Sequence, residues 1–218
     1  MPGILLIERE GGHNPSFALS LRRRRIDVVV EYSFLSAIDN IYRHQPDLIV
    51  LDAASIKTSG VRMAGQLLKA GNGVPLIRIV SAESRSRQDQ VNEFVLIHPF
   101  TPRKLVNLAS RLLPPEPKYE IRVGHVCADT KGGVVRCHGK CTLLSPKTMA
   151  LFLFLQKNRG RLVTRERLMK HVWGTDYTGD MRTIDVHTSW LRGAIELDPD
   201  SLEYLKTVRG VGYRLDVE

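Results

Sequence analysis

The first half of the chain alternates short, strand-like apolar runs with segments of helical length. The runs are ILLI (4–7), IDVVV (26–30), DLIVLD (47–52), VPLIRIV (74–80) and EFVLI (93–97). A strand that is buried on both faces lacks the alternation of polar and apolar residues that a half-exposed strand shows. The pattern therefore predicts an α/β domain, a doubly wound parallel sheet with helices on both faces.

A proline-rich stretch, LLPPEPKYE at 112–120, interrupts this alternation. Three prolines within four residues cannot continue a helix and favour an extended linker. At 218 residues the chain is long enough for two domains with separate cores. We therefore expect a first domain over 1–113, a linker over 114–119 and a second domain over 120–218.

The second half has a different pattern, with short strand-like runs first and turns at TKGG and HG. Ser145-Pro146 and Thr164 are typical helix starts, as N-caps or first helical residues. The chain then ends in YLKTVRGVGYRLDVE, which predicts a β-hairpin around Gly210 and Gly212. The pattern predicts three helices, over about 145–158, 164–173 and 181–196. Strands, three helices and a terminal hairpin are typical of an α+β winged helix-turn-helix domain.

Charge narrows the range of partners. The chain has 32 Lys and Arg against 23 Asp and Glu, a formal net charge of +9. A basic protein of this kind favours polyanions, nucleic acid first and an acidic membrane surface second. No apolar stretch approaches the roughly 18 residues that span a bilayer, and the N-terminus lacks a signal-peptide pattern. We expect a cytoplasmic protein that binds double-stranded DNA and no membrane.

Polar residues that directly follow the predicted strands form the first candidate site. They are Glu8, Arg9 and Glu10, then Asp52, then Ser81, then His98. In a doubly wound sheet, ligands bind where the carboxyl ends of the strands meet. Carboxylates with a hydroxyl there suit a divalent cation and a phosphoryl group.

Three short motifs support a family resemblance. PDLIVLD (46–52), SA (81–82) and IHPF (97–100) resemble the phosphoacceptor strand, the switch hydroxyl and the Lys-Pro-Phe segment of the receiver domain of bacterial two-component response regulators. The whole chain resembles the OmpR/PhoB class of transcription regulators. The resemblance implies a flavodoxin-like receiver followed by a winged helix-turn-helix domain, in a DNA-binding regulator that is not an enzyme. It also implies that Asp52 is the phosphoacceptor.

Two positions depart from the family pattern in ways that change the chemistry. The resemblance places Glu8 and Arg9 at the acidic-pair positions and His98 at the lysine position. Arginine cannot coordinate Mg²⁺, and histidine is mostly neutral at pH 7. Glu10 offers a substitute carboxylate, so Mg²⁺ is expected to bind weakly at most. We therefore expect a receiver that acts largely without phosphorylation, in which Arg9 forms an internal ion pair with Asp52.

Several alternatives stay open at this stage. Arg9 can instead point to solvent and leave Asp52 idle, since exposed ion pairs contribute little. In a conventional, phosphorylation-switched regulator, Glu8 and Glu10 would hold the metal and Asp52 would accept the phosphoryl group. An enzyme would use Asp52 as a nucleophile, and a protein-interaction adaptor would not bind DNA. Sixteen residues between Ser81 and His98, which is fewer than the family pattern, predict a shortened or missing fourth helix.

The segment RTIDVHTSWLRGAIE at 182–196 carries the second candidate site. Ile184, Thr188, Leu191 and Ile195 form one helical stripe that would face the core. The opposite, mixed polar side suits the major groove, where side chains read the base edges. The resemblance makes this segment the recognition helix, and it makes Arg209, at a glycine-rich hairpin tip, a minor-groove contact. The expected DNA contacts are Arg182, Thr183, Asp185, Val186, His187, Ser189, Trp190, Arg192, Arg209 and Tyr213.

Protein partners follow from the resemblance as well. We expect a homodimer on two half-sites. The loop WGTDYTGD (173–180) would contact RNA polymerase through Thr175, Asp176 and Tyr177, or would serve as a spacer between two helices. The sequence leaves open whether a sensor kinase acts on the chain. Three cysteines do not suggest a disulfide framework, and the Cys and His spacing between 125 and 141 matches no zinc pattern, so no metal cofactor is expected.

Overall fold

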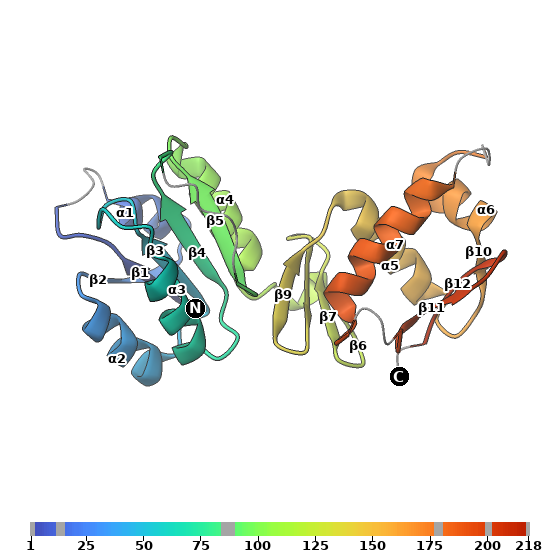
Figure 1. Ribbon diagram of the computed structural model, residues 1–218, viewed down its shortest axis with the longest axis horizontal. Coiled ribbons are helices and arrows are strands. Elements are labelled where there is room, and N and C mark those ends of the chain that lie inside the picture. Colours follow the sequence, from blue (N-terminus) through green and yellow to red (C-terminus); the bar gives the residue numbers. More distant parts are fainter. Residues whose placement is uncertain (1–2, 12–15, 84–89, 177–180, 199–201, 217–218) are drawn as a thin grey trace. The chain divides into compact units, whose positions relative to one another are not determined.

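The computed structural model describes residues 3–11, 16–83, 90–176, 181–198 and 202–216. The chain forms two compact units, with the division between residues 114 and 115 (Figure 1). Each unit has a hydrophobic core of its own. No helix in the described ranges is long and apolar enough to cross a membrane.

A five-stranded parallel sheet forms the centre of the N-terminal unit. Its strands are β1 (Gly3–Ile7), β2 (Asp27–Glu31), β3 (Leu48–Asp52), β4 (Leu76–Val80) and β5 (Glu93–Ile97), in the order β2-β1-β3-β4-β5. Every residue of β3 and β4 is buried, which explains why these strands are apolar apart from Asp52 at the end of β3 and Arg78 in the middle of β4. The predicted doubly wound sheet is confirmed.

Four helices cover the two faces of this sheet (Figure 1). Helices α1 (Phe17–Arg22) and α4 (Pro102–Leu112) pack against each other, as do α2 (Phe34–His44) and α3 (Val61–Ala70). The described residues between β4 and β5, which are 81–83 and 90–92, form no helix.

An ion pair with no exposed surface lies in the same region of the sheet. Arg78, in the middle of β4, directs its Nε at Glu93 Oε1 of β5 over 2.6 Å, and both side chains are 0% exposed. The Nη1 atom of Arg78 also donates to the carbonyl of Ser59, at 2.6 Å. Arg78 thus joins β4, β5 and the loop before α3 by polar contacts inside the core.

The C-terminal unit starts with an antiparallel sheet and continues with three helices and a hairpin. The sheet strands are β6 (Glu120–Val123), β7 (Val126–Asp129), β8 (Val134–Cys137) and β9 (Lys140–Leu143), after a 3-10 turn at Pro117–Tyr119. The helices are α5 (Pro146–Lys157), α6 (Arg165–Leu168) with a π-helical turn at Met169–Trp173, and α7 (Arg182–Ile195). The last sheet has the order β10-β12-β11, from Val163–Thr164, Gly212–Leu215 and Leu205–Val208.

Local sequence signals explain these boundaries. The Ser145 hydroxyl accepts from the backbone N–H of Thr148, and the Thr164 hydroxyl accepts from that of Arg167, so both predicted N-caps are confirmed. Gly212 lies so close to β10 that a Cβ atom there would be 2.0 Å from the Val163 carbonyl oxygen. The predicted hairpin therefore packs against β10 only because residue 212 has no side chain.

Candidate nucleic-acid interface and receiver cleft

A cleft of about 500 Å³ opens at the carboxyl ends of β1, β3, β4 and β5. Four of the six predicted pocket residues line it, whereas Glu8 and Asp52 do not. Its lining residues are Arg9, Glu10, Gly11, Ala54, Ser55, Lys57, Ser81 and His98. Ser55 and Lys57 were not predicted, because they lie in a turn whose path the strand pattern does not define.

Asp52 lies beneath this cleft and is 0% exposed. Its Oδ1 accepts from the backbone N–H of Ser55 at 3.0 Å. The Ser55 hydroxyl in turn donates to the Asp52 carbonyl at 2.9 Å and accepts from the backbone N–H of Arg9 at 3.0 Å. The turn after β3 is thus held against the end of β1 through one serine.

The predicted ion pair between Arg9 and Asp52 is not formed in the described structure. The Arg9 side chain is exposed, whereas Asp52 is buried, and only the Arg9 backbone contacts this turn. Successive side chains of an extended segment point to opposite sides. Because Glu8 points inward and is only 5% exposed, Arg9 points outward.

Within the described part of the chain, the inward-pointing Glu8 has one of its two carboxylate oxygens hydrogen-bonded. Oε1 accepts from the Ser16 hydroxyl at 2.7 Å, and that hydroxyl also accepts from the Ala18 N–H at the start of α1. Oε2 is buried and has no hydrogen-bond partner among the residues that the structure describes. Glu8 thereby connects the end of β1 to the first turn of α1.

The family's Mg²⁺ does not fit the residues at this cleft. The described residues contain no group of three or more Asp, Glu, His or Cys that would hold a metal ion. Arg9 offers a fixed cation where a ligand is needed, and the His98 ring stacks on Phe100 at 4.5 Å. Of the predicted carboxylates, Glu10 alone lines the cleft.

Helix α7 has one buried and one exposed side, as the sequence predicts. Ile184, Thr188, Leu191 and Ile195 are each 1% exposed or less, so the predicted core stripe is confirmed. The opposite face has the spacing i, i+3, i+4, i+7 and i+8 of one helical side. Its exposed residues are Arg182, Asp185, Val186, Ser189 and Trp190, while Thr183, His187 and Arg192 are half-buried.

Asp185 on this face is paired within the protein. Arg165 at the start of α6 donates to both of its carboxylate oxygens, at 2.6 and 3.3 Å, and the Tyr213 hydroxyl of β12 donates to Oδ1. Arg165 also donates to the Tyr213 hydroxyl at 3.1 Å. Tyr213, which the sequence predicts as a DNA contact, is only 2% exposed. In the structure its hydroxyl supports the Asp185 carboxylate. The network joins α6, α7 and the hairpin.

This network makes stability depend on pH. The hydrogen bond from Arg165, with that from Tyr213, holds the pKa of Asp185 below its ordinary value, against the opposing effect of burial. A lowered pKa in the folded state means that the stabilisation is present at neutral pH and is lost as the pH falls below about 4. We expect Asp185→Asn to lower the free energy of unfolding at pH 7 by about 1 kcal/mol or less, since Asp185 is half-exposed. In urea denaturation followed across pH, the difference between variant and wild type should shrink below about pH 4, and a constant difference would contradict this origin.

His187 and Arg192 also make internal contacts. The Nδ1 of His187 lies 2.8 Å from the Thr148 hydroxyl, and burial, with the nearby Lys147 charge, lowers the pKa of His187. Arg192 donates to the Leu205 carbonyl from Nε at 3.1 Å and from Nη2 at 2.8 Å, and to the Thr207 hydroxyl. His187 therefore holds α7 against α5, and Arg192 holds it against β11.

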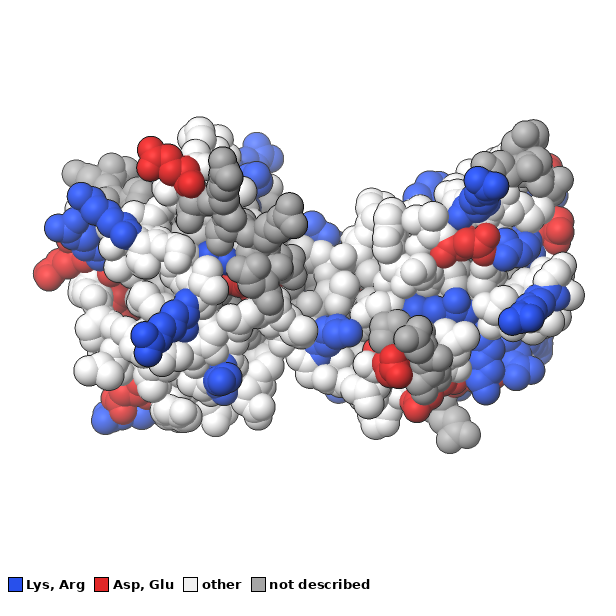
Figure 2. Space-filling view, in the orientation of Figure 1, with Lys and Arg blue, Asp and Glu red and all other residues white. Residues whose placement is uncertain are grey.

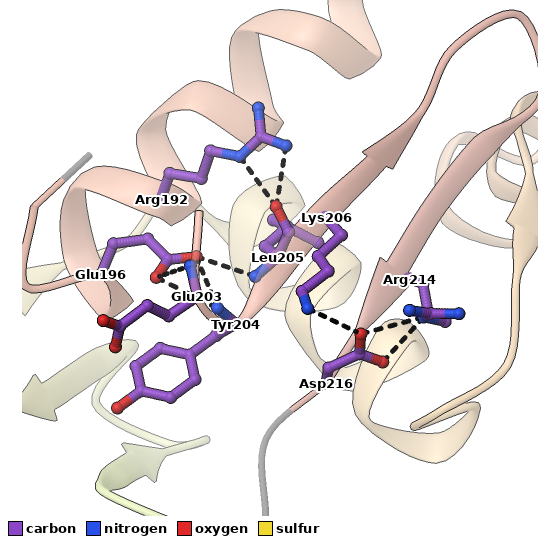
Figure 3. Close-up of polar contacts among 8 residues, drawn as sticks. All are labelled: Arg192, Glu196, Glu203, Tyr204, Leu205, Lys206, Arg214 and Asp216. Atoms are coloured by element: carbon purple, nitrogen blue, oxygen red, sulfur yellow. Dashed lines mark hydrogen bonds and ion pairs between the residues drawn. The ribbon is translucent and has the colours of Figure 1, made fainter. Parts of the chain in front are cut away.

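Glu196, the residue after α7, completes the attachment of the hairpin (Figure 3). Its carboxylate is buried and accepts backbone N–H groups of Glu203, Tyr204 and Leu205 at 2.8 to 3.2 Å. The sequence analysis missed this role, although a lone acid after an amphipathic helix gives a weak signal for it. Arg192 and Glu196, one turn apart, therefore hold the first residues of β11 together.

Exposed Lys and Arg side chains occur on the helices and the hairpin of the C-terminal unit. Figure 2 shows Lys and Arg side chains near the edge of the C-terminal unit where the hairpin strands lie. Arg209 and Gly210 form the exposed hairpin turn, and Gly210 has a φ of +72°, a conformation that favours glycine. The exposed basic residues of the C-terminal unit include Lys147, Arg161, Arg167, Lys170 and Arg209.

The predicted polymerase loop is described only in part. The backbone N–H of Thr175 donates to the Met169 carbonyl at 3.4 Å, and exposed Asp176 lies 3.4 Å from the Lys170 ammonium. Tyr177 lies outside the described residues.

The three cysteines are free thiols, and burial raises the pKa of Cys137 to about 11.

Comparison with known proteins agrees with this architecture. The family described as "Transcriptional regulatory protein, C terminal" matches residues 139–215. The sensory transduction protein RegX3 of Mycolicibacterium smegmatis is 31% identical over 231 residues, which cover 99% of this chain and all of that protein. RegX3 of Mycobacterium tuberculosis is 30% identical with the same coverage. The response regulator DrrB, a Thermotoga maritima OmpR/PhoB homologue, is similar in fold, with a TM-score of 0.52, 23% identity and 99% of both chains covered.

Proposed function

This chain belongs to the OmpR/PhoB-type response regulators and is a DNA-binding transcription regulator, and we propose that its receiver works without phosphorylation of Asp52. The burial of Asp52 carries this proposal. A carboxylate that attacks phosphorus must reach the phosphoryl donor in line, with a metal ion beside it. Asp52 is 0% exposed and is not among the residues that line the cleft.

The cation beside the cleft supports the same proposal. Arg9 occupies a position where the family has a metal-binding acid, and its side chain is exposed. A second cation, Lys57, lines the same cleft. Two fixed positive charges oppose the entry of a divalent cation, and they cannot replace its coordination of oxygen.

Substitution of Arg9 tests the role of that charge. We expect Arg9→Asp to increase the affinity for Mg²⁺ by about tenfold or more, because it removes a cation and adds a carboxylate. Isothermal titration of wild type and variant with Mg²⁺ measures this effect. The matched control is Arg43→Asp, since Arg43 is an exposed arginine on α2 of the same unit. Equal Mg²⁺ affinity in all three proteins would show that Arg9 does not occupy a former metal position.

A conventional phosphorylation switch is the second candidate function. The observation that favours it is the buried Oε2 of Glu8, which no described residue hydrogen-bonds, together with Glu10 in the cleft lining. Incubation with Mg²⁺ and a small phosphoryl donor, followed by intact mass, distinguishes the two candidates. A phosphorylated wild type that Asp52→Asn abolishes supports the conventional switch, and an unmodified wild type supports our proposal.

We propose that α7 enters the major groove while Arg209 of the hairpin turn contacts the minor groove, as a homodimer on two half-sites. The exposed face of α7, which includes Arg182, and the exposed Arg209 at the hairpin turn support this placement. Thr175, Asp176 and Tyr177 are proposed to contact RNA polymerase, on the basis of the family resemblance alone. The affinity for DNA should fall steeply as the salt concentration rises, because the binding includes phosphate contacts. A DNA affinity that does not change with salt would contradict this placement of α7 and Arg209.

A further inference from the structure

Two apolar side chains are exposed on the outward face of α7. Trp190 is 55% exposed and Val186, four residues earlier on the same helical side, is 45% exposed. Because residues four apart on a helix are neighbours, the two side chains form one apolar strip on this face. These two side chains stand between polar residues of the same face, Arg182 and Ser189 among them.

Trp190 has a defined position before any partner binds. Its ring meets the ring of His187 edge to face, at 4.9 Å and 81°. The His187 ring is itself fixed by the buried hydroxyl of Thr148, at 2.8 Å, and by the edge of Trp173, at 5.5 Å. Because the indole is held in place, it loses little conformational freedom on binding.

Asp185, the acidic residue on this face, is hydrogen-bonded within the protein. Asp185 is the acceptor that would read cytosine N4, but its Oδ1 already accepts from both Arg165 and Tyr213, which fixes the carboxylate against the protein. The remaining exposed side chains of this face are the polar Arg182 and Ser189 and the apolar Val186 and Trp190. In the major groove, the apolar group that base pairs present is the 5-methyl group of thymine.

We propose that Trp190, together with Val186, determines base preference by packing on thymine 5-methyl groups. The proposal rests on the placement of α7 in the major groove and does not depend on the state of Asp52. DNA, rather than a protein, is the occupant because the exposed Arg182 lies on this same helical face and the chain has a formal net charge of +9. Arg161 and Lys170 lie on neighbouring segments, and Arg209 lies at the hairpin turn. A protein partner of this face is an outcome of the test below.

Replacing thymine by uracil tests the proposal without changing the protein. A duplex selected from a random-sequence library by the full-length chain is resynthesised with deoxyuridine at one thymine at a time. Uracil keeps every hydrogen-bonding group and loses only the methyl. At fixed salt, we expect one or more positions to lose about fourfold in affinity, which is the effect of exposing one buried methyl.

A protein variant connects this loss to Trp190. In Trp190→Ala, the duplex with thymine should bind about tenfold more weakly, and the uracil substitution should then have almost no effect. The matched control is Leu197→Ala, because Leu197 is 68% exposed but lies beyond the end of α7. This control should behave as wild type with both duplexes.

Three results would overturn the proposal, and they have different meanings. If no uracil position changes affinity, methyl groups are not read. If the uracil effect persists in Trp190→Ala, another side chain reads them. If Trp190→Ala, Val186→Ala and Ser189→Ala all bind the selected duplex as wild type does, then α7 does not enter the groove. The apolar side chains of its exposed face would then form a binding surface for a protein.

Discussion

Arg78→Ala should lower the free energy of unfolding of the N-terminal unit by about 3–5 kcal/mol, the largest effect that we expect from one substitution. The Arg78 and Glu93 side chains have no exposed surface and meet at 2.6 Å. Without the guanidinium, the Glu93 carboxylate stays buried without this counter-charge, and the Ser59 carbonyl loses a donor. Denaturation in urea, followed by a probe in the N-terminal unit, measures the loss.

Two further variants show that the effect comes from a buried charge. Arg43 pairs with Asp39 on the surface of α2, where both side chains are more than half exposed. Arg43→Ala should therefore change the free energy of unfolding by less than about 1 kcal/mol. Replacing both members of the buried pair, Arg78→Met with Glu93→Leu, should recover most of the stability, because both buried charges are then removed together. A double variant as unstable as Arg78→Ala would contradict this explanation.

Glu196→Ala should release the start of the hairpin from α7 and lower both stability and affinity for DNA. Three backbone N–H groups, of residues 203 to 205, lose their acceptor (Figure 3). An unsatisfied buried N–H costs about 1–3 kcal/mol, and Leu205 is fully buried, so we expect a loss of about 3 kcal/mol in the free energy of unfolding. Amide hydrogen exchange at Leu205 should become much faster.

The neighbouring acid provides the control for this prediction. Glu203 is exposed, and it contributes its backbone N–H rather than its carboxylate to the contact. Glu203→Ala should therefore leave stability and DNA affinity close to wild type, whereas Glu196→Gln keeps one acceptor oxygen and should be intermediate. If Glu196→Ala has the stability of Glu203→Ala, the carboxylate does not hold the hairpin.

The fold followed closely from the sequence because its signals are local. Largely apolar runs indicated the five parallel strands, and Ser145, Thr164 and the glycines of the hairpin indicated the ends of elements in the second unit. The stripe of Ile184, Leu191 and their neighbours gave the buried side of α7. Each of these signals depends on residues within one or two turns of the chain.

The direction and partners of charged side chains were harder to predict. The sequence placed Arg9 beside Asp52 but could not show that the chain turns its guanidinium outward. Nor did it show that Asp185 is held by Arg165, twenty residues away, since that contact depends on how α6 packs against α7. Arg78 in an apolar strand was a signal of a buried partner, but its identity required the fold.

DNA affinity with and without a phosphoryl mimic tests the central claim, that the receiver works without phosphorylation of Asp52, most directly. The full-length chain is titrated against its selected duplex at one salt concentration, alone, with Mg²⁺, and with Mg²⁺ and beryllofluoride. We predict the same affinity in all three conditions, because Asp52 is buried and the cleft residues do not suit Mg²⁺. Tighter binding with beryllofluoride that Asp52→Asn abolishes would contradict the claim and establish a working phosphorylation switch.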